Sequence, residues 1–130
     1  GTDIGMLIPV ETVFIQKLEN EIVIETDSGD RGAGATMKQA AEDLKEKADG
    51  MIYLDTADYL ILNREAEALL YQLQSNQKQE VALCETEGRI DVEEITPFLR
   101  AHKPQLRLSD WSSGTALPRL EQEEESYTMK

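Results

Sequence analysis

Histidine and cysteine are almost absent from this chain, which has one of each, His102 and Cys84. A single cysteine excludes an intramolecular disulfide and a metal cage built from cysteines. The neighbour of Cys84 is Glu85, which opposes thiolate formation, so a small buried side chain is expected rather than a reactive thiol. His102 lies between Arg100 and Lys103, where a helix is predicted to end and cations complement the helix dipole. Neither residue is therefore expected to be catalytic.

Basic residues and long apolar runs are also scarce. The chain carries 13 lysines and arginines against 26 acidic residues, a net charge of -13. Such a surface repels phosphate backbones and anionic lipid head groups, so no nucleic-acid partner is expected. No apolar run is long enough for a membrane-spanning helix. The acidic clusters lack calcium-loop spacing, and we expect neither a metal nor another cofactor.

The chain begins with Gly1 rather than methionine. We interpret this start as the sign of a removed segment before Thr2, such as a signal peptide, a lipid-anchoring cysteine or a membrane helix. The native gene is accordingly predicted to encode such a segment. The predicted location is extracytoplasmic, and the alternative is cytoplasmic.

An antiparallel hairpin is predicted near the start of the chain. Residues 12–18 and 22–26 alternate apolar and polar side chains around the turn "ENE". Residues 27–36, "DSGDRGAGAT", follow as a flexible connection in which glycine permits positive φ. Thr36 and Gln39 have the spacing of a capping box, so a helix is predicted to follow and to end with Gly50 at a C′-type position.

The middle of the chain repeats the alternation of strand and helix. Residues 51–62, "MIYLDTADYLIL", form two apolar segments around a polar break. Asn63 is predicted to cap a helix whose buried stripe contains Ala66, Leu69, Leu70 and Leu73. A strand is expected over residues 79–86.

A third helix is predicted after this strand. Asp91 and Glu94 have the spacing of a second capping box. Pro97 leaves a second possibility, in which the helix begins at Thr96 with proline at its first position. Pro104 ends the helix in both cases.

Together these elements predict an α/β fold, more narrowly α+β. It would have a small mixed sheet, opened by a β-hairpin, with about three helices packed on it. Residues 1–111 are expected to form a single globular domain that closes with a short strand over 106–111. Residues 112–130 are rich in Ser, Gly, Pro and Glu and are expected to be a disordered acidic tail.

The glycine-rich segment does not fit a phosphate loop. Gly29 and Gly34 have the Walker spacing, but Ala35 stands where the motif requires lysine. Asp27 and Asp30 bring the wrong charge for an anion. We therefore interpret the segment as a structural connection.

The break "DTAD" is the best candidate site, with Asp55, Thr56 and Asp58 as tentative ligand-binding or partner-binding residues. Aspartic proteases need two copies of an Asp-Thr motif that share a proton, and this chain has one. Aspartate-based phosphatases use D-x-D, whereas the spacing here is D-x-x-D. Asp and Thr side chains bond their own backbone in turns, so the first interpretation is a turn and no catalytic residue is assigned.

The order of these segments resembles a known family. A hairpin precedes "GATMKQAAEDLKEKADG", then "MIYLDTADYLILNREA", a leucine-rich helix and a strand. Over roughly residues 10–100 this pattern looks like the first domain of the Ger(x)C lipoproteins, extracytoplasmic subunits of spore germinant receptors in endospore-forming Firmicutes. The break in that family often contains a histidine, which this chain lacks, and its members continue for two more domains. The resemblance implies an extracytoplasmic, lipid-anchored or signal-bearing protein that binds protein partners and catalyses no reaction.

Three functional hypotheses follow from the sequence. The first is a non-enzymatic extracytoplasmic binding or scaffolding domain related to spore germination or sporulation. The second is a small cytosolic protein-interaction or regulatory module. The third is a carboxylate-based hydrolase that uses Asp55 and Asp58, with Glu85 as the acid or base.

Overall fold

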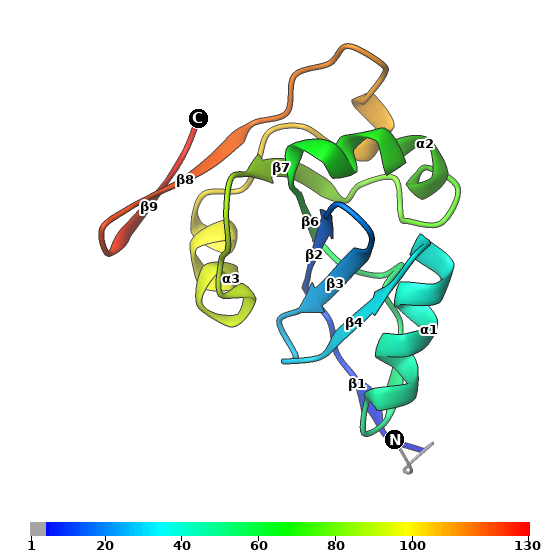
Figure 1. Ribbon diagram of the computed structural model, residues 1–130. Helices are drawn as coiled ribbons and strands as arrows, with labels where there is room; N and C mark the ends of the chain where they lie inside the picture. The colour runs from blue at the N-terminus through cyan, green and yellow to red at the C-terminus, as the bar shows by residue number, and fades with distance from the viewer. Residues whose placement is uncertain (1–4) are drawn as a thin grey trace.

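A seven-stranded mixed sheet forms the centre of the computed structural model, which describes residues 5–130 (Figure 1). Its strand order is β4-β3-β2-β6-β7-β8-β9, and β1 and β5 form a separate parallel pair. The strands are β1 (Leu7–Ile8), β2 (Thr12–Lys17), β3 (Ile22–Thr26), β4 (Arg31–Gly34), β5 (Met51–Ile52), β6 (Tyr59–Leu62), β7 (Ala82–Thr86), β8 (Arg119–Glu123) and β9 (Ser126–Met129). The helices are α1 (Met37–Lys47), α2 (Leu70–Leu73) and α3 (Val92–Ala101), with 3₁₀ helices η1 (Arg64–Leu69) and η2 (Leu108–Asp110). The predicted α/β class is confirmed. What precedes Thr2 lies outside the described residues.

Helices cover both faces of the sheet. One hydrophobic cluster joins α1, η1 and α2 to one face, through side chains such as Leu44, Leu70 and Leu60. A second cluster joins α3 to the other face, through Ile95 and Phe14. Strands β2, β6, β7 and β8 are parallel, as the alternation of strands and helices predicts, and the flanking pairs are antiparallel. No helix among residues 5–130 has the length and apolar character needed to span a membrane.

The glycine-rich segment contains a strand that the sequence did not reveal. The prediction of a flexible connection is wrong for residues 31–34. They form β4, which pairs antiparallel with β3 and packs against α1. A Cβ atom on Gly32 would lie 2.3 Å from the Ala40 carbonyl oxygen and 2.4 Å from the Leu44 nitrogen. The glycine at this position therefore permits backbone-to-backbone contact between strand and helix, rather than flexibility.

The start of α1 is as predicted, and its end is not. Gln39 N donates to Thr36 Oγ1 at 3.1 Å, and Ala35 N donates to Gln39 Oε1 at 3.0 Å. The last helical residue is Lys47 and the C-terminal cap is Ala48, so Gly50 lies one residue beyond the C′ position that was predicted for it. Gly50 instead lies where a Cβ would be 2.6 Å from the Met6 carbonyl oxygen, so it lets the chain pass close to β1.

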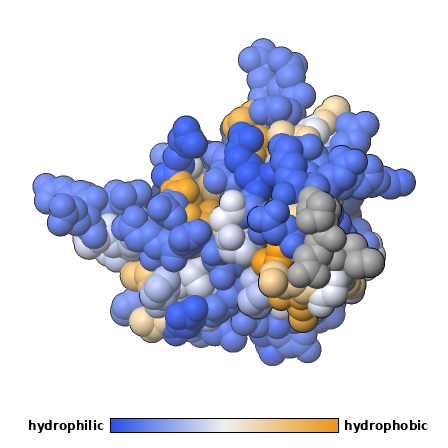
Figure 2. Space-filling model, turned by 90° about the horizontal axis from the view of Figure 1, so that it is seen from below, coloured by the Kyte–Doolittle hydropathy of each residue, from blue (hydrophilic) through white to orange (hydrophobic). Residues whose placement is uncertain are grey.

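The pair of β1 and β5 leaves apolar side chains at the surface. Met6 is 54% exposed, Leu7 62% and Met51 42%. Figure 2 shows apolar surface beside the grey residues, on a face that is otherwise mostly hydrophilic.

Asp91 caps α3, since it accepts hydrogen bonds from Glu93 N and Glu94 N at 3.1 and 3.2 Å. The helix begins at Val92, so the alternative start at Thr96 is wrong and Pro97 lies inside the helix. His102 is the C-terminal cap residue, as its position predicted.

Residues 112–130 are not the disordered tail that their composition suggested. They contain β8 and β9, which extend the sheet beyond β7. Leu120 is buried, and Tyr127 and Met129 pack against the α3 cluster. Apolar side chains at alternate positions hold this hairpin, although acidic residues dominate its composition. The expected strand over 106–111 forms η2 instead, with a single bridge from Arg107 to Ala82.

The contact at Gly32 predicts a strong effect of substitution. Gly32→Ala is expected to lower the free energy of unfolding by about 3 kcal/mol, the upper range for overpacking, because backbone atoms must move. Gly88→Ala is the control: Gly88 has a φ of 75° with open space around a Cβ. The free energy of unfolding of Gly88→Ala should fall by only about 1 kcal/mol, the cost of placing a residue other than glycine at positive φ. Urea denaturation measures both, and an equal loss in the two variants would contradict the packing role of Gly32.

Candidate functional site

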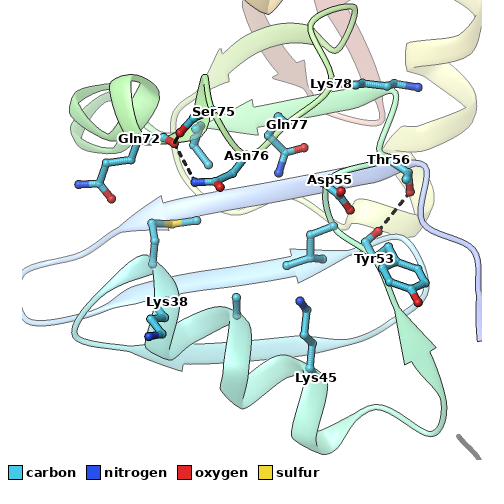
Figure 3. A pocket seen from close by; sticks show the side chains of 14 residues that line it. Lys38, Lys45, Tyr53, Asp55, Thr56, Gln72, Ser75, Asn76, Gln77 and Lys78 are labelled. Carbon is cyan, nitrogen blue, oxygen red and sulfur yellow. Dashed lines mark hydrogen bonds between the residues drawn. The ribbon is translucent and has the colours of Figure 1, made fainter.

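A groove of about 1130 Å³ opens between α1, the break after β5 and the segment that follows α2 (Figure 3). Its apolar lining comes from Met37, Ala41, Leu54 and Leu73. Of these, Leu73 is buried, and the other three pack against the core while keeping part of their surface exposed. The groove is therefore a partly apolar, open depression on the α1 side of the sheet.

Backbone contacts hold the break that forms one wall. Ala57 is fully buried and anchors the segment to the core. Asp58 N donates to the Glu11 carbonyl oxygen at 2.8 Å, and Lys78 N donates to the Asp55 carbonyl oxygen at 3.3 Å. The Thr56 hydroxyl donates to the Tyr53 carbonyl oxygen at 3.3 Å. The break is thus tied to the residue before β2 on one side and to the segment after α2 on the other.

The three predicted site residues have different roles in this wall. Asp55 and Thr56 line the groove, whereas Asp58 pairs with Lys78 Nζ at 2.5 Å. Thr56 bonds its own turn, as the turn interpretation requires. The Asp55 carboxylate is exposed and shows no hydrogen bond or ion pair with any described residue. Asp55 is therefore available to a ligand, and its side chain does not hold the turn.

Glu85 lies at the opposite end of the sheet. Glu85 on β7 is the partner of Leu62 on β6. Leu62 follows Asp58 by four residues. At about 3.3 Å per residue, this separates Asp58 and Glu85 by roughly 13 Å. The structure does not bring Glu85 together with the two aspartates that the hydrolase hypothesis combines with it.

Lysines give the groove a charge opposite to that of the protein. Lys38, Lys45 and Lys78 line it, and Asp55 is the one acidic residue in the described lining. Lys38 and Lys45 are seven residues apart, so they lie on one face of α1 about 10.5 Å apart along its axis. Both are exposed, and neither forms an ion pair within residues 5–130. In a chain of net charge -13, this is a local excess of positive charge.

Amide side chains complete the lining. Asn76 Nδ2 and Ser75 Oγ donate to the Gln72 carbonyl oxygen at 2.9 and 3.2 Å, which fixes the segment after α2. Gln77 Oε1 is shielded from solvent and accepts no hydrogen bond within the described chain. A buried acceptor in that state costs about 1–3 kcal/mol of stability.

Sequence reasoning missed the lysines and the amide segment. Lys38 and Lys45 flank the half-exposed Ala41 on α1, a pattern that the sequence does contain. It is not distinguishable from an ordinary solvated helix face without the opposite wall. The contribution of residues 72–78 depends on the turn after α2, which no motif marks.

A pair of carboxyl groups lies outside the groove. Glu67, in η1, faces Glu85, near the end of β7. Burial, followed by the charge of Glu85 and a hydrogen bond to it, raises the pKa of Glu67 to about 7. Arg119 Nε lies 3.4 Å from Glu85 Oε1. The pair therefore holds a proton in the folded protein at a pH where an ordinary glutamate has lost it.

Cys84 is buried, as predicted, and burial together with the charge of Glu85 raises its pKa to about 12. Within residues 5–130, no group of three or more His, Cys, Asp and Glu side chains is placed to hold a metal ion.

The raised pKa of Glu67 predicts a pH dependence of stability. Folding takes up a proton between about pH 4.5 and about pH 7, so the free energy of unfolding falls as the pH rises through this range. Glu67→Gln cannot take up this proton and should show a flatter profile in urea denaturation at about pH 5 and about pH 8. Glu65→Gln, on the exposed side of η1, is the control and should retain the wild-type slope. Equal slopes in wild type and Glu67→Gln would contradict the shared proton.

The exposed position of Asp55 predicts a small effect on stability. Asp55→Ala is expected to change the free energy of unfolding by less than about 0.5 kcal/mol, the range for surface substitutions. Asp91→Ala removes a true helix cap and should lose about 1 kcal/mol in the same denaturation experiment. A loss at Asp55 as large as that at Asp91 would show that its side chain holds the turn.

No family model matches this chain, and comparison with curated proteins and with solved structures found no match. What the groove binds must therefore be inferred from the residues that line it.

Proposed function

We propose that this protein is a non-enzymatic binding or scaffolding domain whose groove takes an extended segment of a partner protein. The observation that carries the proposal is the groove itself. It has an apolar floor, exposed amines on one wall and backbone-fixed amides on another. Sites for peptide segments combine apolar contact with a few placed polar groups in this way.

The arrangement of the carboxylates supports binding over hydrolysis. Asp58 is engaged by Lys78, and Glu85 lies at the far end of the sheet. General acid and base groups must both reach the same substrate atoms, within about 3 Å of the protons that they transfer. The groove places Asp55 beside amines, amides and apolar side chains, which are groups that bind rather than react.

The proposed location is the outer side of the cytoplasmic membrane of a Gram-positive bacterium, in a role related to spore germination or sporulation. The ground for it is the resemblance of residues 10–100 to the first domain of Ger(x)C lipoproteins, in which a polar break divides the same apolar double segment. A cytosolic interaction module would use the same groove. Separation of membrane and cytosolic fractions of the source cells, followed by immunodetection of this domain, distinguishes the two locations.

Selection from a random peptide library displayed on phage tests the binding role. Peptides selected on the wild-type protein should bind Ala41→Gln at least about tenfold more weakly, because the longer side chain fills the floor of the groove and removes a contact of about 1.4 kcal/mol. Ala101→Gln, the same substitution at an exposed position of α3 outside the groove, is the matched control and should bind normally. Peptides that bind Ala41→Gln as tightly as the wild type would place the binding surface elsewhere and contradict the proposal.

A further inference from the structure

The distribution of charge around the groove identifies the kind of segment that it would accept. Lys38 and Lys45 line the groove from α1, and Lys45 extends from the helix toward the opposite wall (Figure 3). Asp55 lies on the opposite wall, beside Thr56. Positive charge is thus confined to the α1 side, because Lys78, at the end of the groove, is paired with Asp58. An occupant that complements this arrangement carries its negative charges along one edge, facing α1.

We infer that the groove binds an extended acidic peptide segment with two carboxylates about 10 Å apart and an apolar side chain between them. This inference rests on the proposed binding function and adds the chemistry of the partner. The carboxylates would pair with Lys38 and Lys45, and the apolar side chain would contact Ala41 and Leu54.

The spacing follows from the geometry of α1 and of extended peptides. Residues i and i+7 of an α-helix lie about 10.5 Å apart along its axis. In a polyproline II segment, residues i and i+3 project from the same edge and lie about 9.3 Å apart, while the residues between them project elsewhere. The sequence Glu-Pro-x-Glu therefore presents two carboxylates to α1 and one intervening side chain to the floor.

The other groups of the groove fit the same occupant. Asp55 opposes acidic residues on the second edge of the segment, which fixes its orientation across the groove. The net charge of -13 also repels an acidic ligand, but ions screen distant charges beyond about 8 Å at physiological salt, whereas the lysines act at contact distance.

Fluorescence polarisation with three labelled heptapeptides tests this inference. The probes are the acidic peptide Gly-Glu-Pro-Leu-Glu-Pro-Gly, a neutral peptide with both glutamates replaced by glutamine, and a basic peptide with both replaced by lysine. The wild-type protein is expected to bind the acidic peptide at least about fivefold more tightly than the neutral one, which corresponds to two exposed ion pairs. The basic peptide should bind most weakly.

Charge reversal locates the contact. Lys38→Glu/Lys45→Glu should bind the acidic peptide at least about tenfold more weakly than the wild type does. It should bind the basic peptide more tightly. Lys17→Glu/Lys103→Glu changes the net charge equally at two exposed positions outside the groove, and it should behave as the wild type. If thermal melting shows that the reversed variant is unfolded, Lys38→Gln/Lys45→Gln takes its place and should bind acidic and neutral peptides equally.

Several outcomes would overturn the inference. Equal affinity for acidic and neutral peptides, or a preference for the basic one, removes the acidic specificity. If Ala41→Gln still weakens peptide binding when the acidic preference is absent, the proposed binding function holds and only the acidic specificity is wrong. Failure of all three peptides to bind also overturns the acidic segment, while the phage selection decides the binding role independently. Full displacement of the acidic peptide by millimolar inorganic phosphate would assign the lysines to a simple anion instead.

Discussion

The close approach of α1 to β4 at Gly32 is the contact on which the groove depends. Any side chain at this position would meet backbone atoms of α1 at 2.3 and 2.4 Å. Without one, Ala40 and Leu44 reach the sheet and become fully buried. Because α1 is a wall of the groove, the strand that seats the helix also sets the width of the groove and the direction of Lys38 and Lys45.

The second wall arises from a change of sheet. β5 pairs with β1, and seven residues later β6 begins the centre of the main sheet. The chain must cross between the two sheets, and it does so as an irregular segment whose backbone is bonded to Glu11 and Lys78. Buried Ala57 anchors the crossing, while Asp55 and Thr56 on its outer side face the groove. The candidate site therefore exists because two adjacent strands belong to different sheets.

Total charge and local charge lead to different conclusions about this protein. The net charge of -13 repels phosphate-rich and acidic partners alike at long range, but salt screens this repulsion and the lysines of the groove act at contact distance. The lysines on α1 are seven residues apart and unpaired, whereas Lys47, on the same helix, is neutralised by Asp43. Which lysines remain available is decided by the position of each one around the helix. The pair of Glu67 and Glu85 is a similar case, since the charge on Glu67 is set by a neighbour that only the sheet register supplies.

The sequence by itself determined the elements whose signals are local. The hairpin, the capping residues Thr36, Asn63 and Asp91, and the buried stripe of η1 and α2 all follow from spacing within a few residues, and so does the class of fold. Tertiary structure decided what depends on distant partners. It made a strand of residues 31–34, because α1 packs on their glycines, and an ordered hairpin of an acidic C-terminal segment, because three apolar side chains meet α3. It also made "DTAD" one wall of a groove, since only folding places α1 and residues 72–78 around it.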